Sequence, residues 1–178
     1  MADTTLPLFW QRIDQAEQAL CLCVNRGCQR PALRAFFSTV SRLGDGSLWY
    51  ALIVAVAAFD AMRVALAMAM SGTLGALLYR TLKTRLVRER PFISHASIVC
   101  GAAPLDRYSF PSGHTLHAVN FTILAGAQYP WLLPALVPLA LAMAASRVVL
   151  GLHYPSDVAA GAVIGVALGL TTLYLAPF

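Results

Sequence analysis

Charged side chains are scarce in this sequence. They make up 12% of its 178 residues, about half the share that is usual in a soluble domain. Long runs contain no Asp, Glu, Lys or Arg at all: 48–59, 64–79, 121–145 and 158–178. A membrane-spanning helix needs about 20 predominantly apolar residues, and runs of this kind supply them. The scarcity of charge therefore argues against a soluble domain and indicates a polytopic membrane protein.

Cysteine is scarce as well, and acidic residues are fewer than basic ones. The 4 cysteines show neither a CxxC pair nor the spacing of a metal site, so we predict no metal centre. The net charge is +5, yet the chain has no polar domain that could form a groove for nucleic acid. We therefore expect a lipid bilayer and a lipid ligand as its partners, and no nucleic acid.

The N-terminal region, 1–45, mixes charged and apolar residues. Apolar residues recur at helical spacing over 6–24, with polar residues on the opposite side. Such an amphipathic helix is better suited to lying at the membrane interface than to crossing the membrane. A second, partly amphipathic stretch runs to LGDG at 43–46, where the glycines would turn the chain into the membrane.

Beyond this turn the pattern predicts five membrane-spanning helices, at 46–60, 62–82, 113–128, 131–149 and 157–176. A sixth would be present if residues 12–30 also crossed the bilayer. The expected fold is all-α, a polytopic membrane helical bundle that forms a single domain over 1–178. Gly161, Gly165 and Gly169 recur at four-residue spacing in the last span, which is typical of close helix packing. An oligomer is not indicated.

The order of the spans decides which loops share a side of the membrane. The second span ends and the third begins on one side. The fourth span ends and the fifth begins on that same side. Segments 83–115 and 146–157 therefore lie at the same end of the bundle, whichever way the chain is inserted.

These two segments hold three groups of polar residues. The first group is Lys83 with Arg90 and Pro91, and the second is PSGH at 111–114. The third is SRVVLGLHYPSD over 146–157. Ionisable residues at the ends of membrane spans are costly, so they point to a functional site.

The cationic and backbone groups suit the binding of a phosphate ester. Lys83, Arg90 and Arg147 could neutralise the phosphoryl oxygens, the arginines through paired hydrogen bonds. Ser112 and Gly113 open the third span, and backbone N–H groups at the start of a helix bind anions. The sequence therefore predicts a phosphate site built from these residues.

The remaining groups suit cleavage of that ester. An imidazole oriented by a carboxylate is a plausible nucleophile, and His153 with Asp157 fits that description. His114 could then protonate the leaving oxygen. His117 and Tyr108 are secondary candidates for the same pocket. Solvent or headgroup contacts are expected for Arg85, Arg88 and Arg107, and Asp106 is expected to be an ordinary loop residue.

The three motifs KxxxxxxRP, PSGH and SRxxxxxHxxxD match, in order and placement, the signature of the type 2 phosphatidic acid phosphatase family. The chain thus resembles bacterial members of that family, and in overall shape the undecaprenyl-pyrophosphate phosphatases. The resemblance implies a membrane phosphatase that uses neither a metal nor a cofactor. It implies that His153 forms a phosphohistidine, that Asp157 orients it and that His114 is the acid. The phosphate cradle would comprise Lys83, Arg90, Ser112, Gly113 and Arg147.

By this resemblance the substrate is a lipid phosphate or pyrophosphate: undecaprenyl pyrophosphate, phosphatidylglycerophosphate, phosphatidic acid or a lipid A phosphate. Two alternatives stay open, a phosphotransferase that passes the phosphohistidine to another lipid and a non-catalytic lipid-binding membrane protein. The expected location is the bacterial inner membrane. The basic residues near the site would favour a cytoplasmic face. Phosphate binding explains much of that charge, however, and the resemblance favours the periplasmic face.

Overall fold

The chain is built from helices, as the sequence predicts. The computed structural model describes residues 8–59 and 62–177, and within them the only strand-like pairing is an isolated bridge between Glu89 and Tyr108. The helices, in chain order, are α1 (Leu8–Asn25), the 3-10 helix η1 (Arg26–Gln29), α2 (Pro31–Leu43), α3 (Ser47–Ala58), α4 (Met62–Leu86), α5 (Pro91–Ser94), α6 (Gly113–Gln128), the 3-10 helix η2 (Pro130–Leu132), α7 (Leu133–Val149) and α8 (Pro155–Leu175).

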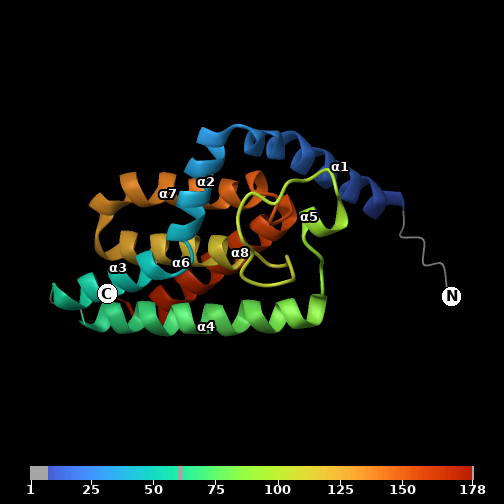
Figure 1. Ribbon diagram of the computed structural model, residues 1–178. Coiled ribbons are helices and arrows are strands. Elements are labelled where there is room, and N and C mark those ends of the chain that lie inside the picture. The colour runs from blue at the N-terminus through green and yellow to red at the C-terminus, as the bar shows by residue number, and fades with distance from the viewer. Residues whose placement is uncertain (1–7, 60–61, 178) are drawn as a thin grey trace.

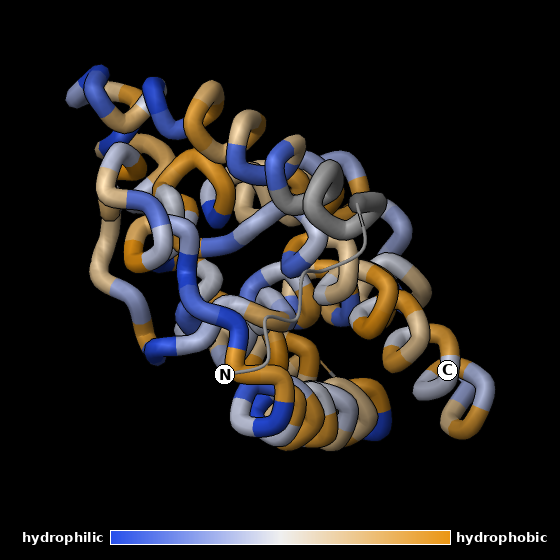
Figure 2. The backbone as a smooth tube through the Cα atoms, turned by 90° about the vertical axis from the view of Figure 1, so that its right-hand side faces the viewer, coloured by the Kyte–Doolittle hydropathy of each residue, from blue (hydrophilic) through white to orange (hydrophobic). Residues whose placement is uncertain are grey.

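The helix bounds follow the predicted spans to within a few residues. Within the described residues, three helical segments are long and apolar enough to cross a membrane, namely α4, η2 with α7, and α8. The other two predicted spans correspond to α3 and α6, which have 12 and 16 residues. Figure 2 shows the hydrophobic character of the helix that leads to the C-terminus. The structure thus supports a multi-pass membrane protein, and the count of five spans stays a prediction.

Helix α6 lies at the centre of the bundle, packed against α8, α7 and α4 (Figure 1). Because protein surrounds it, this helix can be short and can carry buried polar residues. Asn120 is fully buried and accepts a hydrogen bond of 3.1 Å from the Ser71 hydroxyl of α4. The Ser71 hydroxyl in turn accepts one of 3.0 Å from Thr172 of α8. These polar contacts tie three helices together around α6.

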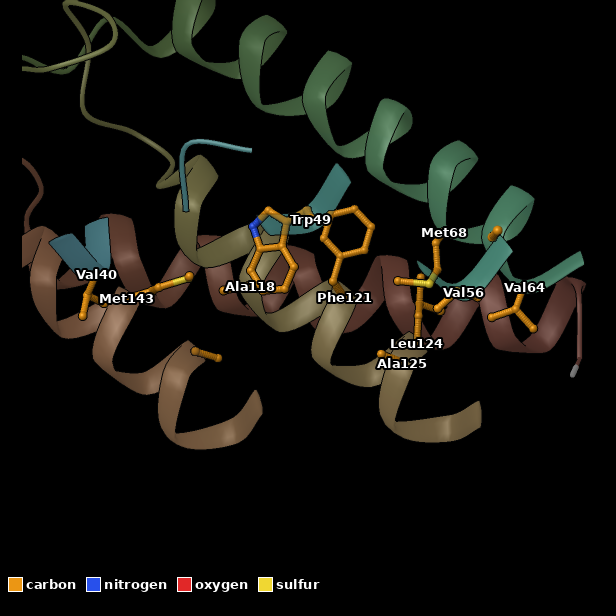
Figure 3. Packing of buried hydrophobic residues seen from close by; sticks show 12 residues of the cluster. Val40, Trp49, Val56, Val64, Met68, Ala118, Phe121, Leu124, Ala125 and Met143 are labelled. Carbon is orange, nitrogen blue, oxygen red and sulfur yellow. The ribbon is translucent and has the colours of Figure 1, made fainter. Parts of the chain in front are cut away.

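The hydrophobic core fills the space between α3, α4, α6 and α7. Figure 3 shows Trp49 of α3 and Phe121 of α6 side by side, and their rings stack with centroids 5.2 Å apart. Met68, Leu124 and Met143, which are fully buried, extend the same cluster. Lipid tails are as apolar as these side chains, so close van der Waals packing within the cluster fixes how the helices sit relative to one another.

The predicted end of the bundle does carry the three motifs. Lys83 lies near the end of α4, Gly113 begins α6, Arg147 lies in the last turn of α7 and His153 directly precedes α8. All four line one cavity. The long connection between α4 and α6, with the short helix α5 in it, lies at this end (Figure 1). The deduction from the order of the spans is confirmed.

The glycines of α8 allow close contact with α6. Gly161, Gly165 and Gly169 are buried along one face of α8. A Cβ atom at Gly165 would lie 2.6 Å from the carbonyl oxygen of Leu116, whereas one at Gly169 would lie 3.0 Å from a side-chain carbon of Ile123. A side chain can shift more easily than a helix backbone, so the two positions differ in what they tolerate.

We expect Gly165→Ala to lower the free energy of unfolding by about 1–3 kcal/mol, the usual cost of overpacking. Gly169→Ala, the matched control, should cost less because Ile123 can move aside. Thermal unfolding of both variants in detergent checks this. Equal stability of the two variants would contradict the close backbone packing of α6 on α8.

Candidate active site

A cavity of about 680 Å³ opens at the motif end of the bundle. Its walls include residues of all three motifs, namely Lys83, Arg90, Gly113, His114, Arg147 and His153. The secondary candidates His117 and Tyr108 line it too. Ser112 and Asp157 do not line the cavity but are fully buried behind it. The structure therefore brings the predicted site residues together around one space.

His153 and Asp157 lie across a turn, because Pro155 begins α8 between them. The Nδ1 atom of His153 is 3.6 Å from Oδ2 of Asp157, and both side chains are buried. The same carboxylate oxygen accepts a hydrogen bond of 2.8 Å from the backbone N–H of Tyr154. Asp157 thus caps the start of α8 while facing the imidazole.

The surroundings of His153 favour one neutral form of its ring. The Nη1 atom of Arg90 lies 3.3 Å from Nε2 of His153, and a guanidinium can only donate hydrogen bonds. Nε2 must therefore offer its lone pair, which leaves the proton on Nδ1, toward Asp157. Burial lowers the pKa of His153 well below its ordinary value, and the charges of Arg147, Arg90 and Lys83 lower it further. A neutral imidazole with an unprotonated Nε2 atom is the form that can attack phosphorus, once its lone pair turns from the N–H of Arg90 to the substrate.

His114 has an acidic partner that the sequence did not suggest. Its Nε2 atom lies 2.7 Å from Oδ1 of Asp45, in the turn between α2 and α3. The hydrogen bond from His114 is the main reason why the pKa of Asp45 lies below its ordinary value. An ionised carboxylate at this distance favours the protonated form of the histidine, whereas the burial of His114 disfavours it.

Lys83 and Arg90 share a carboxylate in this structure. The Nζ atom of Lys83 donates to both oxygens of Asp106, at 2.8 and 2.7 Å, and Nη2 of Arg90 donates to Oδ1 at 2.8 Å. Burial raises the pKa of Asp106, but the hydrogen bonds and charges of Lys83 and Arg90 outweigh burial and lower it overall. A phosphate that enters the cavity must therefore compete with Asp106 for these two cations.

Arg147 and the start of α6 complete the cationic wall. Arg147 is 2% exposed, donates to the Ser41 hydroxyl of α2 and keeps a buried Nε atom without a hydrogen-bond partner. A buried unpaired donor of this kind is costly. Ser112 is the N-cap of α6 and accepts from the backbone N–H of Thr115. Gly113 follows it at the cavity wall.

Comparison with known proteins is consistent with this geometry. The family model described as the PAP2 superfamily matches residues 60–178. The chain belongs to the PAP2 superfamily. It is accordingly a lipid phosphatase of the membrane, as the three motifs predict.

Its PAP2 relatives include proteins that align over most of both chains. A protein of Mycobacterium tuberculosis named decaprenylphosphoryl-5-phosphoribose phosphatase is 34% identical over 165 residues, which cover 89% of this chain and 90% of the relative. The crystal structure of LpxE of Aquifex aeolicus has a TM-score of 0.78 and 27% identity, covering 88% of this chain and 93% of the other. The structure of a transmembrane PAP2-type phosphatidylglycerolphosphate phosphatase of Bacillus subtilis shares the fold, with a TM-score of 0.76, 24% identity and coverage of 92% and 86%.

Two predictions about the PAP2 site were wrong. Arg88 is not a solvent contact, because its Nη1 atom lies 2.7 Å from Oδ1 of the buried Asp157. Asp106 is not an ordinary loop residue, because it pairs with two buried cations of the site. Arg107 does behave as expected, since its side chain is 70% exposed.

Helical periodicity carries no signal for loop residues such as Arg88 and Asp106. The order of the spans, however, places the turn with Asp45 on the catalytic side and could have drawn attention to it.

We predict that Asp45→Asn moves the basic limb of the pH profile of kcat/KM to lower pH. That limb reports the essential acid of the free enzyme, and an asparagine cannot stabilise protonated His114 as an ionised carboxylate does. A shift of about one pH unit corresponds to about 1.4 kcal/mol. Steady-state kinetics between pH 3 and 9, with Glu89→Gln as control, measures it, and the window extends to low pH because His114 is buried. A basic limb that stays in place would show that Asp45 does not act on the general acid.

Proposed function

We propose that this lipid phosphatase cleaves a phosphate ester through a covalent phosphohistidine on His153. The Nε2 lone pair of His153 attacks phosphorus while the bond from phosphorus to the lipid oxygen breaks. His114 gives its proton to that leaving oxygen. Water then attacks the phosphohistidine, His114 takes a proton from it, and inorganic phosphate leaves. The unprotonated Nε2 atom of His153 at the wall of the cationic cavity, where only an N–H of Arg90 occupies its lone pair, is the observation that carries this proposal.

The phosphoryl oxygens would lie against the cationic wall. Lys83, Arg90 and Arg147 line the same cavity as His153, and their combined positive charge suits a phosphate that becomes more negative as its ester bond breaks. Arg147 contributes a buried guanidinium to this wall. Gly113, at the start of α6, would add a backbone N–H group.

We propose that the substrate is a polyprenyl-linked lipid whose headgroup ends in a phosphate or a pyrophosphate. Support comes from the relative that aligns over 89% of this chain, whose name states decaprenylphosphoryl-5-phosphoribose as its substrate. The cavity has room for more than a phosphate, since it extends past Arg80, Thr84 and Tyr108, whose polar groups could contact a sugar. The membrane-spanning helices around it would hold the lipid chain.

We further propose that the cavity opens on the periplasmic side of the bacterial inner membrane. Much of the positive charge near the cavity is engaged in the site itself, so it says little about orientation. A membrane-impermeant thiol reagent applied to intact cells should label a variant that keeps Cys100 alone, because this residue lies in the α5–α6 connection at the cavity end. Labelling that appears only after cell lysis would place the cavity in the cytoplasm.

The test of function is phosphate release by the purified protein in the presence of a chelator. The panel contains decaprenylphosphoryl-5-phosphoribose, undecaprenyl pyrophosphate, phosphatidylglycerophosphate, phosphatidic acid and a lipid A phosphate. We expect turnover with the polyprenyl lipids, with a preference of at least about tenfold, or about 1.4 kcal/mol of transition-state discrimination. His153→Ala should abolish turnover.

Three results would contradict the proposal. A requirement for a divalent metal would exclude the metal-free route, and full activity of His153→Ala would exclude the nucleophile. Phosphate transfer that depends on an added acceptor lipid would identify a phosphotransferase instead. Stronger turnover of phosphatidic acid or phosphatidylglycerophosphate would keep the chemistry and overturn the polyprenyl substrate.

A further inference from the structure

The carboxylate of Asp157 makes contacts on two sides. Its Oδ2 atom faces Nδ1 of His153, while its Oδ1 atom accepts a hydrogen bond of 2.7 Å from Nη1 of Arg88. Asp157 is fully buried, so its charge needs a cationic or hydrogen-bonding partner at each oxygen. Arg88 supplies the cation, and together with the backbone N–H of Tyr154 it sets the rotation of the carboxylate that faces His153.

Arg88 is in turn held by the N-terminal helix. Its Nη2 atom donates to Oε2 of Glu17 in α1 at 2.7 Å, and its Nη1 atom also donates to the Ser156 hydroxyl at 2.7 Å. The guanidinium lies over the ring of Tyr154, 4.1 Å from its centroid. The other oxygen of Glu17 accepts a hydrogen bond of 2.7 Å from the backbone N–H of Ser156. Glu17 therefore fixes Arg88 and the first turn of α8 at once.

Further contacts hold α1 against the loops of the site. Asn25 donates to the carbonyl oxygens of Val99 and Val149, both at 2.9 Å, and accepts from the N–H of Val99 at 2.8 Å. Gln18 lies 3.1 Å from the ring of His95. Figure 1 shows α1 running past α5 and the beginning of α8. The position of Glu17 is thus determined by several contacts along the helix.

Neither Glu17 nor Arg88 belongs to the lining of the cavity. Any effect of these two residues on the reaction must therefore pass through Asp157 and the turn that carries His153. Glu17 also lies outside residues 60–178, the part of the chain that matches the superfamily. The N-terminal helix consequently adds a contact that the three motifs do not contain.

We propose that Glu17 and Arg88 are positioning residues for the nucleophile. They hold the carboxylate of Asp157 beside the ring of His153, with Oδ2 3.6 Å from Nδ1, a little beyond hydrogen-bond distance. As the bond between Nε2 and phosphorus forms, the imidazole becomes positively charged. A carboxylate that is already in place stabilises this charge without having to reorganise. The inference rests on the proposed role of His153 as nucleophile, and it makes α1 a part of the catalytic apparatus.

A double-mutant cycle tests the proposal on the full-length protein in detergent micelles. The variants are Glu17→Gln, Arg88→Ala and the two combined. Glutamine keeps an oxygen for the N–H of Ser156 but loses the charge that holds Arg88. We expect kcat of Arg88→Ala to fall about 10- to 100-fold, the range seen when an outer partner of a catalytic group is removed, with KM nearly unchanged. Glu17→Gln should lower kcat less, and should have almost no further effect when Arg88 is already alanine.

Arg88→Lys and a second ion pair complete the design. Lysine keeps the charge but lacks the planar fork that contacts Asp157 and Glu17 together, so its kcat should be intermediate. Where Arg88→Ala does not fold, the same cycle is run on Arg88→Lys.

Arg107 and Glu89 form a control pair at the same end, with side chains 70% and 44% exposed. Arg107→Ala and Glu89→Gln should leave kcat and KM as in the wild type.

Thermal unfolding of every variant separates positioning from folding. The proposal would be overturned if the losses of kcat in the two single variants simply added up in the double variant. It would also be overturned if kcat fell only in proportion to the fraction of folded protein. A rise in KM at constant kcat would overturn it as well, because it would mean contact with the substrate. A wild-type protein without turnover on any lipid would instead overturn the proposed function, and the inference with it.

Discussion

The arrangement of this protein depends on the burial of several positive charges beside one cavity. Lys83, Arg90 and Arg147 are each less than a tenth exposed, and isolated charges in such surroundings are strongly disfavoured. Carboxylates from the connecting segments offset part of this cost, Asp106 most directly. The hydrogen bonding of these cations is incomplete, since the Nε atom of Arg147 has no partner. A site of this kind gains most from an anion that brings more than one oxygen, and a phosphate group does so.

The bundle can hold these charges because its helices end together at one place. Helix α6 is enclosed by protein on several sides, and the glycines of α8 let the two helices approach until a single Cβ atom would collide with backbone. The start of α6 and the turn before α8 are then fixed relative to each other, and the backbone N–H of Ser112 donates to the carbonyl oxygen of Asp157 at 3.0 Å. Precise placement of His153 and His114 follows from helix packing rather than from flexible loops.

Much of the fold and the motif residues of the cavity could be predicted from the sequence, and the reasons are physical. Long apolar runs identify membrane helices whatever their neighbours are, and the order of the spans then places the motif segments at one end. The order of the spans places Asp45 at this end too, but the pairings made by Asp45, Asp106, Arg88 and Glu17 could not be predicted in the same way. Each of these residues contacts its partner only because the fold brings the two together. Glu17 and Arg88, for example, are 71 positions apart in the sequence, and neither periodicity nor motif spacing indicates such a pairing. Helix α6, which is mostly buried, has 16 residues, fewer than the bilayer rule suggests for a span, and periodicity alone does not reveal that protein encloses it.

The central claim is that phosphorus becomes bonded to His153 during turnover. The most direct measurement is rapid acid-free quenching of the enzyme with a lipid substrate labelled in its phosphate, followed by mapping of the label on the chain. We predict a phosphoryl group that is labile to acid, located in the peptide that contains His153 and absent from His153→Ala. A label on another side chain, or turnover with no labelled enzyme at any time after mixing, would contradict the account.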